Sequence, residues 1–103
     1  MNILITGKNG FLAKEIADYY KDREDIELFL TDRKSLDPRC FVQVEKFFNT
    51  NKIDIVIHTA VRGGKRQHQP EIEDIFDNLS MFHNLLSFSN KFVGSAVQII
   101  DLP

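Results

Sequence analysis

The sequence predicts an α/β fold: a parallel sheet of about four strands, in the order 3-2-1-4, with helices on both faces. Three observations predict it. Short runs rich in Ile, Leu and Val alternate along the chain with segments of helical periodicity. These apolar runs show no alternation of polar and apolar residues, which is typical of strands buried on both faces. Strands joined through helices run parallel with right-handed crossovers, so we expect half of a doubly wound fold.

The first half of the chain is expected to supply two strands and two helices. Residues 2–6 form the first apolar run, and residues 10–22 follow with apolar side chains at three- and four-residue steps. A second strand is predicted at 26–30. A polar loop with a proline comes next, and a short helix then ends near Asn51.

The second half is expected to add a strand at 53–58, a long helix at 72–89 and a fourth strand at 96–100. If the sheet ends at that fourth strand, residues 96–100 form an unpaired apolar edge, which favours self-association. The long helix is apolar on two faces. One stripe holds Ile72, Ile75, Phe76, Leu79, Phe82 and Leu86, and a second face holds Met81, Leu85 and Phe88.

Length and composition limit the class of protein. The chain has 103 residues, 43% hydrophobic and 27% charged, which suits one folded domain over residues 1–103. A net charge of −2 argues against a nucleic-acid or anionic-membrane partner. No apolar run approaches the roughly 20 residues of a membrane span. The single cysteine, Cys40, cannot form an internal disulfide, so we expect a cytoplasmic protein.

The junction of the first strand and first helix carries the clearest motif. Residues 7–13 read Gly-Lys-Asn-Gly-Phe-Leu-Ala. A residue without a Cβ lets backbone N–H groups approach a pyrophosphate, and the helix N-terminus adds a partial positive charge. The spacing is Gly-x-x-Gly-x-x-Ala, not the Gly-x-Gly-x-x-Gly of the usual dinucleotide fingerprint. The alternative is an ordinary tight turn without a ligand. The position of the motif directly after the first strand favours phosphate binding instead.

Together with Thr6, this motif resembles the Thr-Gly-x-x-Gly-x-x-Gly/Ala start of the extended short-chain dehydrogenase/reductases, which include nucleotide-sugar epimerases, dehydratases and reductases. The resemblance extends to about residue 91 and is closest to dTDP-4-dehydrorhamnose reductases and GDP-fucose synthases. It implies a partial Rossmann fold. The further similar stretches are residues 30–37 with 44–48, residues 54–60, and residues 61–64 with Pro70 and 77–81.

The resemblance implies a nicotinamide dinucleotide as cofactor, and a nucleotide-sugar substrate in full-length relatives. It assigns roles to four parts of the chain. The implied contacts are Gly7, Lys8, Asn9, Gly10, Phe11 and Leu12 for the pyrophosphate, Asp32 and Arg33 for the adenosine ribose, Asp37 for the adenine edge, Thr59, Ala60 and Val61 for the nicotinamide-side ribose, and Asn78 near the cofactor.

The choice between NAD and NADP stays open at this point. A carboxylate such as Asp32 accepts hydrogen bonds from ribose hydroxyls and repels a 2′-phosphate, whereas the guanidinium of Arg33 does the reverse. Both could also be solvated loop charges. No spacing of His, Cys, Asp or Glu suggests a metal site.

The catalytic pair of the resembled family, Tyr-x-x-x-Lys, is absent from this sequence. Its only tyrosines, Tyr19 and Tyr20, lie in the first predicted helix and neither has a Lys four places on. We therefore expect no catalytic residue here. The leading hypothesis is the cofactor-binding N-terminal part of a nucleotide-sugar enzyme, truncated before its catalytic and substrate-binding portion. The alternatives are a non-enzymatic binding or interaction module, and an enzyme completed by a second chain or by forming a homo-oligomer.

Overall fold

In the part of the chain that the structure describes, five strands form one sheet in the order β2-β1-β3-β4-β5. The computed structural model describes residues 1–60, 72–94 and 99–101, and no helix within these ranges is long and apolar enough to span a membrane. The elements are β1 (Asn2–Thr6), α1 (Phe11–Tyr20), β2 (Glu27–Thr31), α2 (Phe41–Thr50), β3 (Ile55–His58), α3 (Ile72–Phe88), β4 (Lys91–Gly94) and β5 (Ile99–Asp101).

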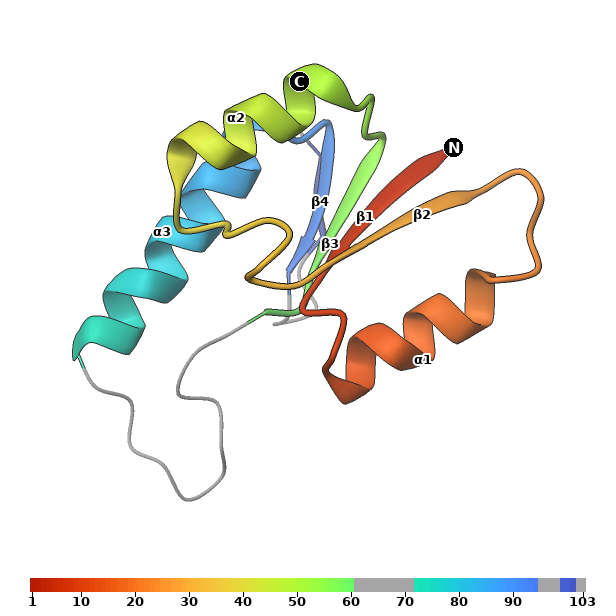
Figure 1. Cartoon of the computed structure of the whole chain (residues 1–103), viewed down its shortest axis with the longest axis horizontal. Helices are drawn as coiled ribbons and strands as arrows, with labels where there is room; N and C mark the ends of the chain where they lie inside the picture. Colours follow the sequence, from red (N-terminus) through yellow and green to blue (C-terminus); the bar gives the residue numbers. More distant parts are fainter. Residues whose placement is uncertain (61–71, 95–98, 102–103) are drawn as a thin grey trace.

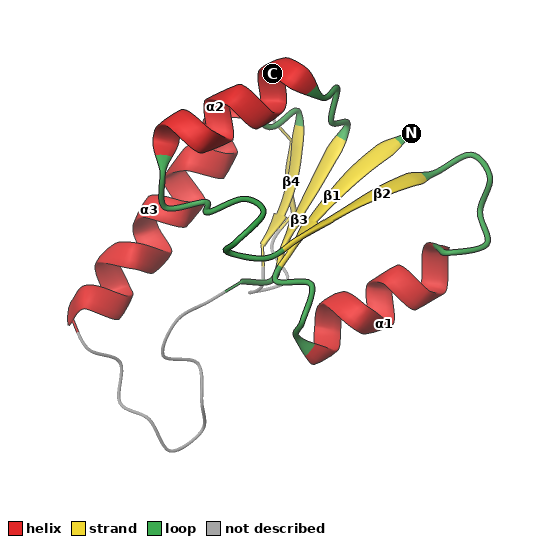
Figure 2. Cartoon of the chain, viewed as in Figure 1, coloured by secondary structure: helices red, strands yellow, loops and turns green. Residues whose placement is uncertain are grey.

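Helices cover both faces of the sheet, as the sequence predicts (Figures 1 and 2). Side chains alternate between the faces along each strand, so β1 contributes to two separate cores. Ile3 and Ile5 pack under α1 with Ala13. Leu4 faces the other side, beneath α2 and α3. The core on that side consists of Leu4, Leu36, Val44, Ile53, Val56, Leu85 and Phe92.

The predicted fold class is confirmed, and counted along this chain the parallel strands have the order 2-1-3-4. The expected order 3-2-1-4 is that of the first four strands of a complete doubly wound sheet, whose third strand lies outside its second. In this chain β3 takes the place of that sheet's fourth strand and pairs with β1, with Ile55 opposite Ile3. The strands β2 and β3 thus lie on opposite sides of β1, so the order in which strands are added to the sheet changes direction at β1. Doubly wound sheets bind ligands at such a switch point, beyond the carboxyl ends of the strands.

The fourth parallel strand is β4 at Lys91–Gly94, not the predicted strand at 96–100. The turn after α3 leads directly into β4, and Phe92 is fully buried. The sequence signal is weak because only two residues of β4 besides glycine are apolar. Residues 95–98 lie outside the described residues. Over Ile99–Asp101 the edge predicted to be unpaired is paired antiparallel with β4.

The two apolar faces of α3 differ in burial. The face with Met81 and Leu85 is buried in the core. The other stripe is exposed, with fractional exposures from 38% to 70% for all its members except Leu86, which is half-buried. The exposed members are Ile72, Ile75, Phe76, Leu79 and Phe82.

Candidate functional site

The turn between β1 and α1 requires glycine at its first position. Gly7 has a φ of +72°, a backbone conformation that other residues rarely adopt. A Cβ there would lie 2.8 Å from Thr59 Oγ1 and 3.0 Å from the backbone nitrogen of Ala60, so the ends of β1 and β3 leave no room for one. The N–H of Gly10 donates to the carbonyl of Gly7 at 2.9 Å and closes the turn.

Beyond this turn, the N-terminus of α1 is open to an anion. The first intrahelical bond runs from the N–H of Lys14 to the carbonyl of Gly10, so the N–H groups of residues 11–13 have no acceptor within the helix. Gly10 offers no side-chain cap, and the first turn holds no acidic residue. The backbone N–H of Lys8 is not available for the predicted pyrophosphate contact, because it already donates to the carbonyl of Thr31 at 3.0 Å.

The hydroxyl of Thr6 joins the carboxyl ends of β1 and β3. It accepts the backbone N–H of Thr59 at 3.1 Å and that of Ala60 at 3.4 Å. The same oxygen lies 2.7 Å from Nδ1 of His58. The hydroxyl of Thr59 donates back to the carbonyl of Thr6 at 2.6 Å. Burial lowers the pKa of His58 to about 4, so the imidazole is neutral near pH 7 and its Nδ1 can accept the Thr6 proton.

At the end of β2, Asp32 folds the following loop onto itself. Its Oδ1 accepts the N–H of Lys34 at 3.0 Å, the N–H of Ser35 at 2.9 Å and the Ser35 hydroxyl at 3.2 Å. Its Oδ2 lies 3.8 Å from Nζ of Lys8. The backbone N–H of Ser35 is the main cause that lowers the pKa of this carboxyl. Arg33 beside it is exposed, with no hydrogen bond or ion pair to the described residues.

The loop between β2 and α2 contains a second carboxylate, Asp37, and Arg39 links it to α3. Asp37 Oδ1 accepts the Nε–H of Arg39 at 3.0 Å, and Oδ2 accepts Nη2–H at 2.8 Å, which lowers the pKa of Asp37. Arg39 also reaches Asp77 on α3 at 3.5 Å. On the same helix, Asn84 donates to the carbonyl of Pro38 at 3.0 Å. The carboxylate predicted to meet the adenine edge is therefore used to brace the loop.

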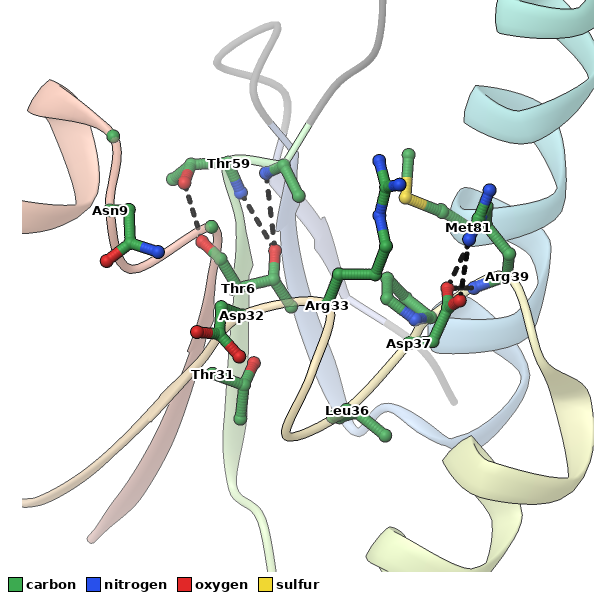
Figure 3. A pocket seen from close by; sticks show the side chains of 14 residues that line it. Thr6, Asn9, Thr31, Asp32, Arg33, Leu36, Asp37, Arg39, Thr59 and Met81 are labelled. Atoms are coloured by element: carbon green, nitrogen blue, oxygen red, sulfur yellow. Dashed lines mark hydrogen bonds and ion pairs between the residues drawn. The ribbon is translucent and has the colours of Figure 1, made fainter.

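These elements enclose a cavity of about 420 Å³ at the switch point (Figure 3). Eight of the predicted site residues line it, drawn from three separate parts of the chain. They are Gly7, Asn9, Gly10, Asp32, Arg33, Asp37, Thr59 and Ala60.

Four other predicted residues do not line the cavity. Lys8 lies at its margin beside Asp32, whereas Phe11 and Leu12 are exposed at the start of α1. Asn78 lies half-buried on α3. Val61 lies outside the described residues.

The cavity also includes residues that the sequence did not single out. Thr6 is one, and its position just before Gly7 in the motif is the signal that could have identified it. Thr31 is another: it is 5% exposed, and its hydroxyl oxygen is the one buried side-chain polar atom without a hydrogen bond in the described part of the chain. The remaining additions are Leu36, Pro38, Arg39 and Met81.

Neither a metal site nor a catalytic acid is evident among residues 1–60, 72–94 and 99–101. No group of three His, Cys, Asp or Glu side chains there could hold a metal ion. Tyr19 and Tyr20 stack edge to face on each other, with ring centres 4.8 Å apart, at the end of α1 far from the Gly7 turn. What the site offers is backbone N–H groups, hydroxyls and a mixture of charged side chains.

A parallel sheet with a glycine turn and an uncapped helix at its switch point defines a dinucleotide-binding domain of the Rossmann type. A glycine cradle with no room for a Cβ, an open helix N-terminus and an unpaired buried hydroxyl fit such a cofactor. The family model described as "NAD dependent epimerase/dehydratase family" matches residues 3–99, so the chain belongs to that family.

Three solved structures have a fold similar to that of this chain. A GDP-6-OMe-4-keto-L-xylo-heptose reductase from Campylobacter jejuni is 26% identical, with a TM-score of 0.79 over 90% of this chain and 28% of that one. A GDP-D-glycero-L-gluco-heptose synthase from the same organism, in the presence of NADPH, is 27% identical, with a TM-score of 0.75 over 88% and 29%. A GDP-L-fucose synthetase from Naegleria fowleri, at 22% identity and a TM-score of 0.75 over 90% and 30%, shows the shared fold.

This chain therefore spans less than a third of the length of these three structures. No curated protein matches it in sequence.

Proposed function

We propose that this chain binds a nicotinamide dinucleotide at the switch point, with the pyrophosphate on the N-terminus of α1. The observation that carries the proposal is the turn at Gly7. Gly7 has a positive φ and leaves no space for a Cβ, and the N-terminus of α1 beyond it is uncapped. These features allow an anion to approach and be bound by backbone N–H groups. The cavity runs from this turn to the loop after β2, where the adenosine half would be held by residues 31–39.

The whole protein, in this proposal, is an NAD(P)-dependent enzyme that reduces, epimerises or dehydrates a nucleotide sugar. Its family and the two similar GDP-heptose enzymes support this class. The bound nicotinamide supplies hydride exchange, and the residues described here bind and orient the dinucleotide. The sequence contains no Tyr-x-x-x-Lys, so we expect this chain alone to bind the dinucleotide without turnover.

A second candidate is an interaction module that uses the same fold. The observation in its favour is the exposed stripe of α3, whose apolar side chains continue over the length of the helix. Exposed apolar patches of this kind mark protein interfaces. We propose that a second copy of this chain covers the stripe, which is compatible with dinucleotide binding.

Titration of the chain with NADH and NADPH tests the main proposal. We expect saturable binding, followed by nicotinamide fluorescence, and a ligand-dependent rise in Tm. No hydride transfer to a GDP-4-keto-sugar is expected without another chain. Gly7→Val is the control that should lose binding of both dinucleotides. If neither dinucleotide binds at millimolar concentration, dinucleotide binding is refuted and the interaction module is favoured.

A further inference from the structure

We propose that Asn9 is a site of spontaneous deamidation, that this modification weakens dinucleotide binding, and that a bound dinucleotide protects the chain from it. The first part concerns the chemistry of the turn before α1 alone, whereas the other two parts rest on the proposed function. Asn9 is the only asparagine in the sequence that is followed by a glycine.

The reaction takes place between the side chain of Asn9 and the backbone of Gly10. Once deprotonated, the nitrogen of Gly10 attacks Cγ of Asn9. The Cγ–Nδ2 bond then breaks, and the proton lost by the nitrogen leaves with the ammonia. Water opens the resulting succinimide ring to aspartate or to isoaspartate, so no other reactant is needed and no electrons are exchanged. Glycine favours the attack because it has no Cβ to hinder its own nitrogen.

Both reacting groups are accessible in the structure. Asn9 and Gly10 are exposed, and they lie in the turn between β1 and α1. The side-chain amide of Asn9 makes no hydrogen bond with the described residues, so it is free to rotate toward the backbone (Figure 3). The N–H of Gly10 donates to the carbonyl of Gly7 at 2.9 Å, and this bond opposes the attack. The reaction therefore proceeds from the fraction of molecules in which the turn is open.

Each product is unfavourable for an anion bound at this turn. Aspartate adds a negative charge beside the uncapped N-terminus of α1, where the proposed ligand is itself negative. Isoaspartate also inserts a methylene group into the backbone, which displaces the N–H of Gly10 from the carbonyl of Gly7. A carboxylate near a helix N-terminus is nevertheless favourable for the helix. Conversion to aspartate should therefore weaken binding without lowering the stability of the fold.

A dinucleotide bound at the same turn opposes the reaction. Its pyrophosphate accepts N–H groups at the start of α1 and thereby keeps the turn closed. Asn9 also lines the cavity, so the ligand restricts the rotation of its side chain. Deamidation is thus confined to the unbound chain. When the free dinucleotide is at about ten times its Kd, the unbound fraction is about one-eleventh, so the rate should fall about tenfold.

Peptide mass spectrometry of the chain, incubated at mildly alkaline pH, tests the modification site. We expect a gain of one mass unit at Asn9 that is faster at higher pH, because the attacking nitrogen must be deprotonated. NADPH at the same excess should slow it about tenfold. Gly10→Ala should suppress the reaction. Asn49 is the internal control, since it is exposed at the end of α2 but precedes a threonine, and it should stay unmodified over the same period.

The fold itself could prevent this reaction, and a short peptide decides the matter. If a synthetic peptide of residues 5–13 gains the mass unit and the ligand-free chain does not, the bond from Gly10 to Gly7 keeps the turn closed. That result overturns the modification site. Equal rates in wild-type protein and Gly10→Ala would also overturn it.

Titration with NADPH tests the consequence for binding. Asn9→Asp, which reproduces the aspartate product, should bind NADPH at least roughly tenfold more weakly than wild-type protein and keep its Tm. Asn49→Asp adds the same charge outside the cavity and should leave the affinity unchanged.

Two results overturn the inference while dinucleotide binding stands. One is wild-type affinity in Asn9→Asp and in the deamidated chain, and the other is an equal rate of deamidation with and without bound NADPH. If the unmodified chain binds neither NADPH nor NADH, the proposed function is refuted together with protection by the ligand. Mass spectrometry then still decides whether Asn9 is modified, because that measurement needs no ligand.

Discussion

The hydroxyl of Thr6 and the imidazole of His58 meet across 52 residues of sequence and fix the ends of β1 and β3 at the cavity floor. Thr6 already accepts two backbone N–H groups, so its own proton is free for Nδ1 of a neutral His58. A protonated imidazole would present an N–H to an oxygen whose two lone pairs already accept the N–H groups of Thr59 and Ala60. The hydrogen-bond network is thus matched to the neutral state of His58.

The stability of the fold should accordingly fall with pH in a defined window. Burial lowers the pKa of His58 to about 4, below the value of about 6.5 in the unfolded chain. Between these values the unfolded state binds the proton and the folded state does not, so stability is fully present above about pH 6.5 and is lost as pH falls toward 4. The expected loss is about 3 kcal/mol.

Urea denaturation of wild-type protein and His58→Gln across this window measures the effect. Glutamine does not titrate, so the free energy of unfolding of the variant should depend less steeply on pH. The carboxylates titrate in both proteins and cancel in the comparison. Parallel pH profiles for the two proteins would show that His58 is not the group responsible.

Substitution of Gly7 and of Gly10 by alanine should affect the stability of the fold to different extents, although both changes should weaken dinucleotide binding. Gly7→Ala places a Cβ 2.8 Å from Thr59 Oγ1 at a φ of +72°, which costs about 1–2 kcal/mol for the backbone alone and adds a steric clash. Gly10→Ala has an ordinary φ of −81° and meets only the Gly7 carbonyl at 3.3 Å, so it should cost less than about 1 kcal/mol.

Both substitutions should nevertheless weaken dinucleotide binding, because Gly10 lies where the backbone must approach the pyrophosphate. Thermal denaturation and dinucleotide titration of the two variants check this. A Gly10→Ala protein that binds like wild type would place the pyrophosphate elsewhere.

At the scale of elements, the loop between β2 and α2 is held to α3 by Arg39. This side chain joins Asp37 in the loop to Asp77 on the helix. Arg39→Ala should lower the Tm and speed hydrogen exchange of the backbone amides in the loop, because the loop then keeps only the hydrogen bond from Asn84 to Pro38 among its described polar links to α3. Arg33→Ala is the matched control from the same loop: its guanidinium makes no hydrogen bond or ion pair with the described residues, so stability should change little. Equal exchange rates in both variants would contradict the role of Arg39.

At the scale of the whole molecule, periodicity was sufficient to predict the fold class, whereas the residues of the cavity floor came from the glycine motif and from the resemblance to the extended short-chain dehydrogenase/reductases. The short helix that ends near Asn51 was also predictable, and Cys40 stands at its N-cap without a side-chain hydrogen bond, as its lack of a capping oxygen implies. Gly7, Gly10, Thr59 and Ala60 line the cavity because a parallel sheet brings its carboxyl ends together.

The features that sequence missed depend on long-range pairing. The register of β4 is set by burial of Phe92 beside β3, which a run of two apolar residues does not reveal. The use of Asp37 by Arg39 depends on α3 lying against the loop. The two apolar faces of α3 have similar composition, so only the packed structure distinguishes the buried face from the exposed one.

That exposed face leads to the last prediction, self-association through α3. Phe76 and Leu79 are 66% and 60% exposed in the middle of a helix of 17 residues. Two such helices related by a two-fold axis can bury each other's stripe, because a symmetric interface presents the same patch twice. We therefore expect the mass measured by light scattering or sedimentation to rise with protein concentration toward that of a dimer.

Leu79→Glu should weaken this association at least roughly tenfold, because it places a charge at the centre of an apolar contact. Ser80→Glu adds the same charge one position away on the helix, outside the stripe, and should leave the association unchanged. Both variants should keep the Tm of the monomer and their affinity for the dinucleotide, since Leu79 and Ser80 are exposed and lie outside the cavity. A wild-type chain that stays monomeric at high concentration, or equal disruption by the two glutamates, would show that the stripe is not the self-association surface.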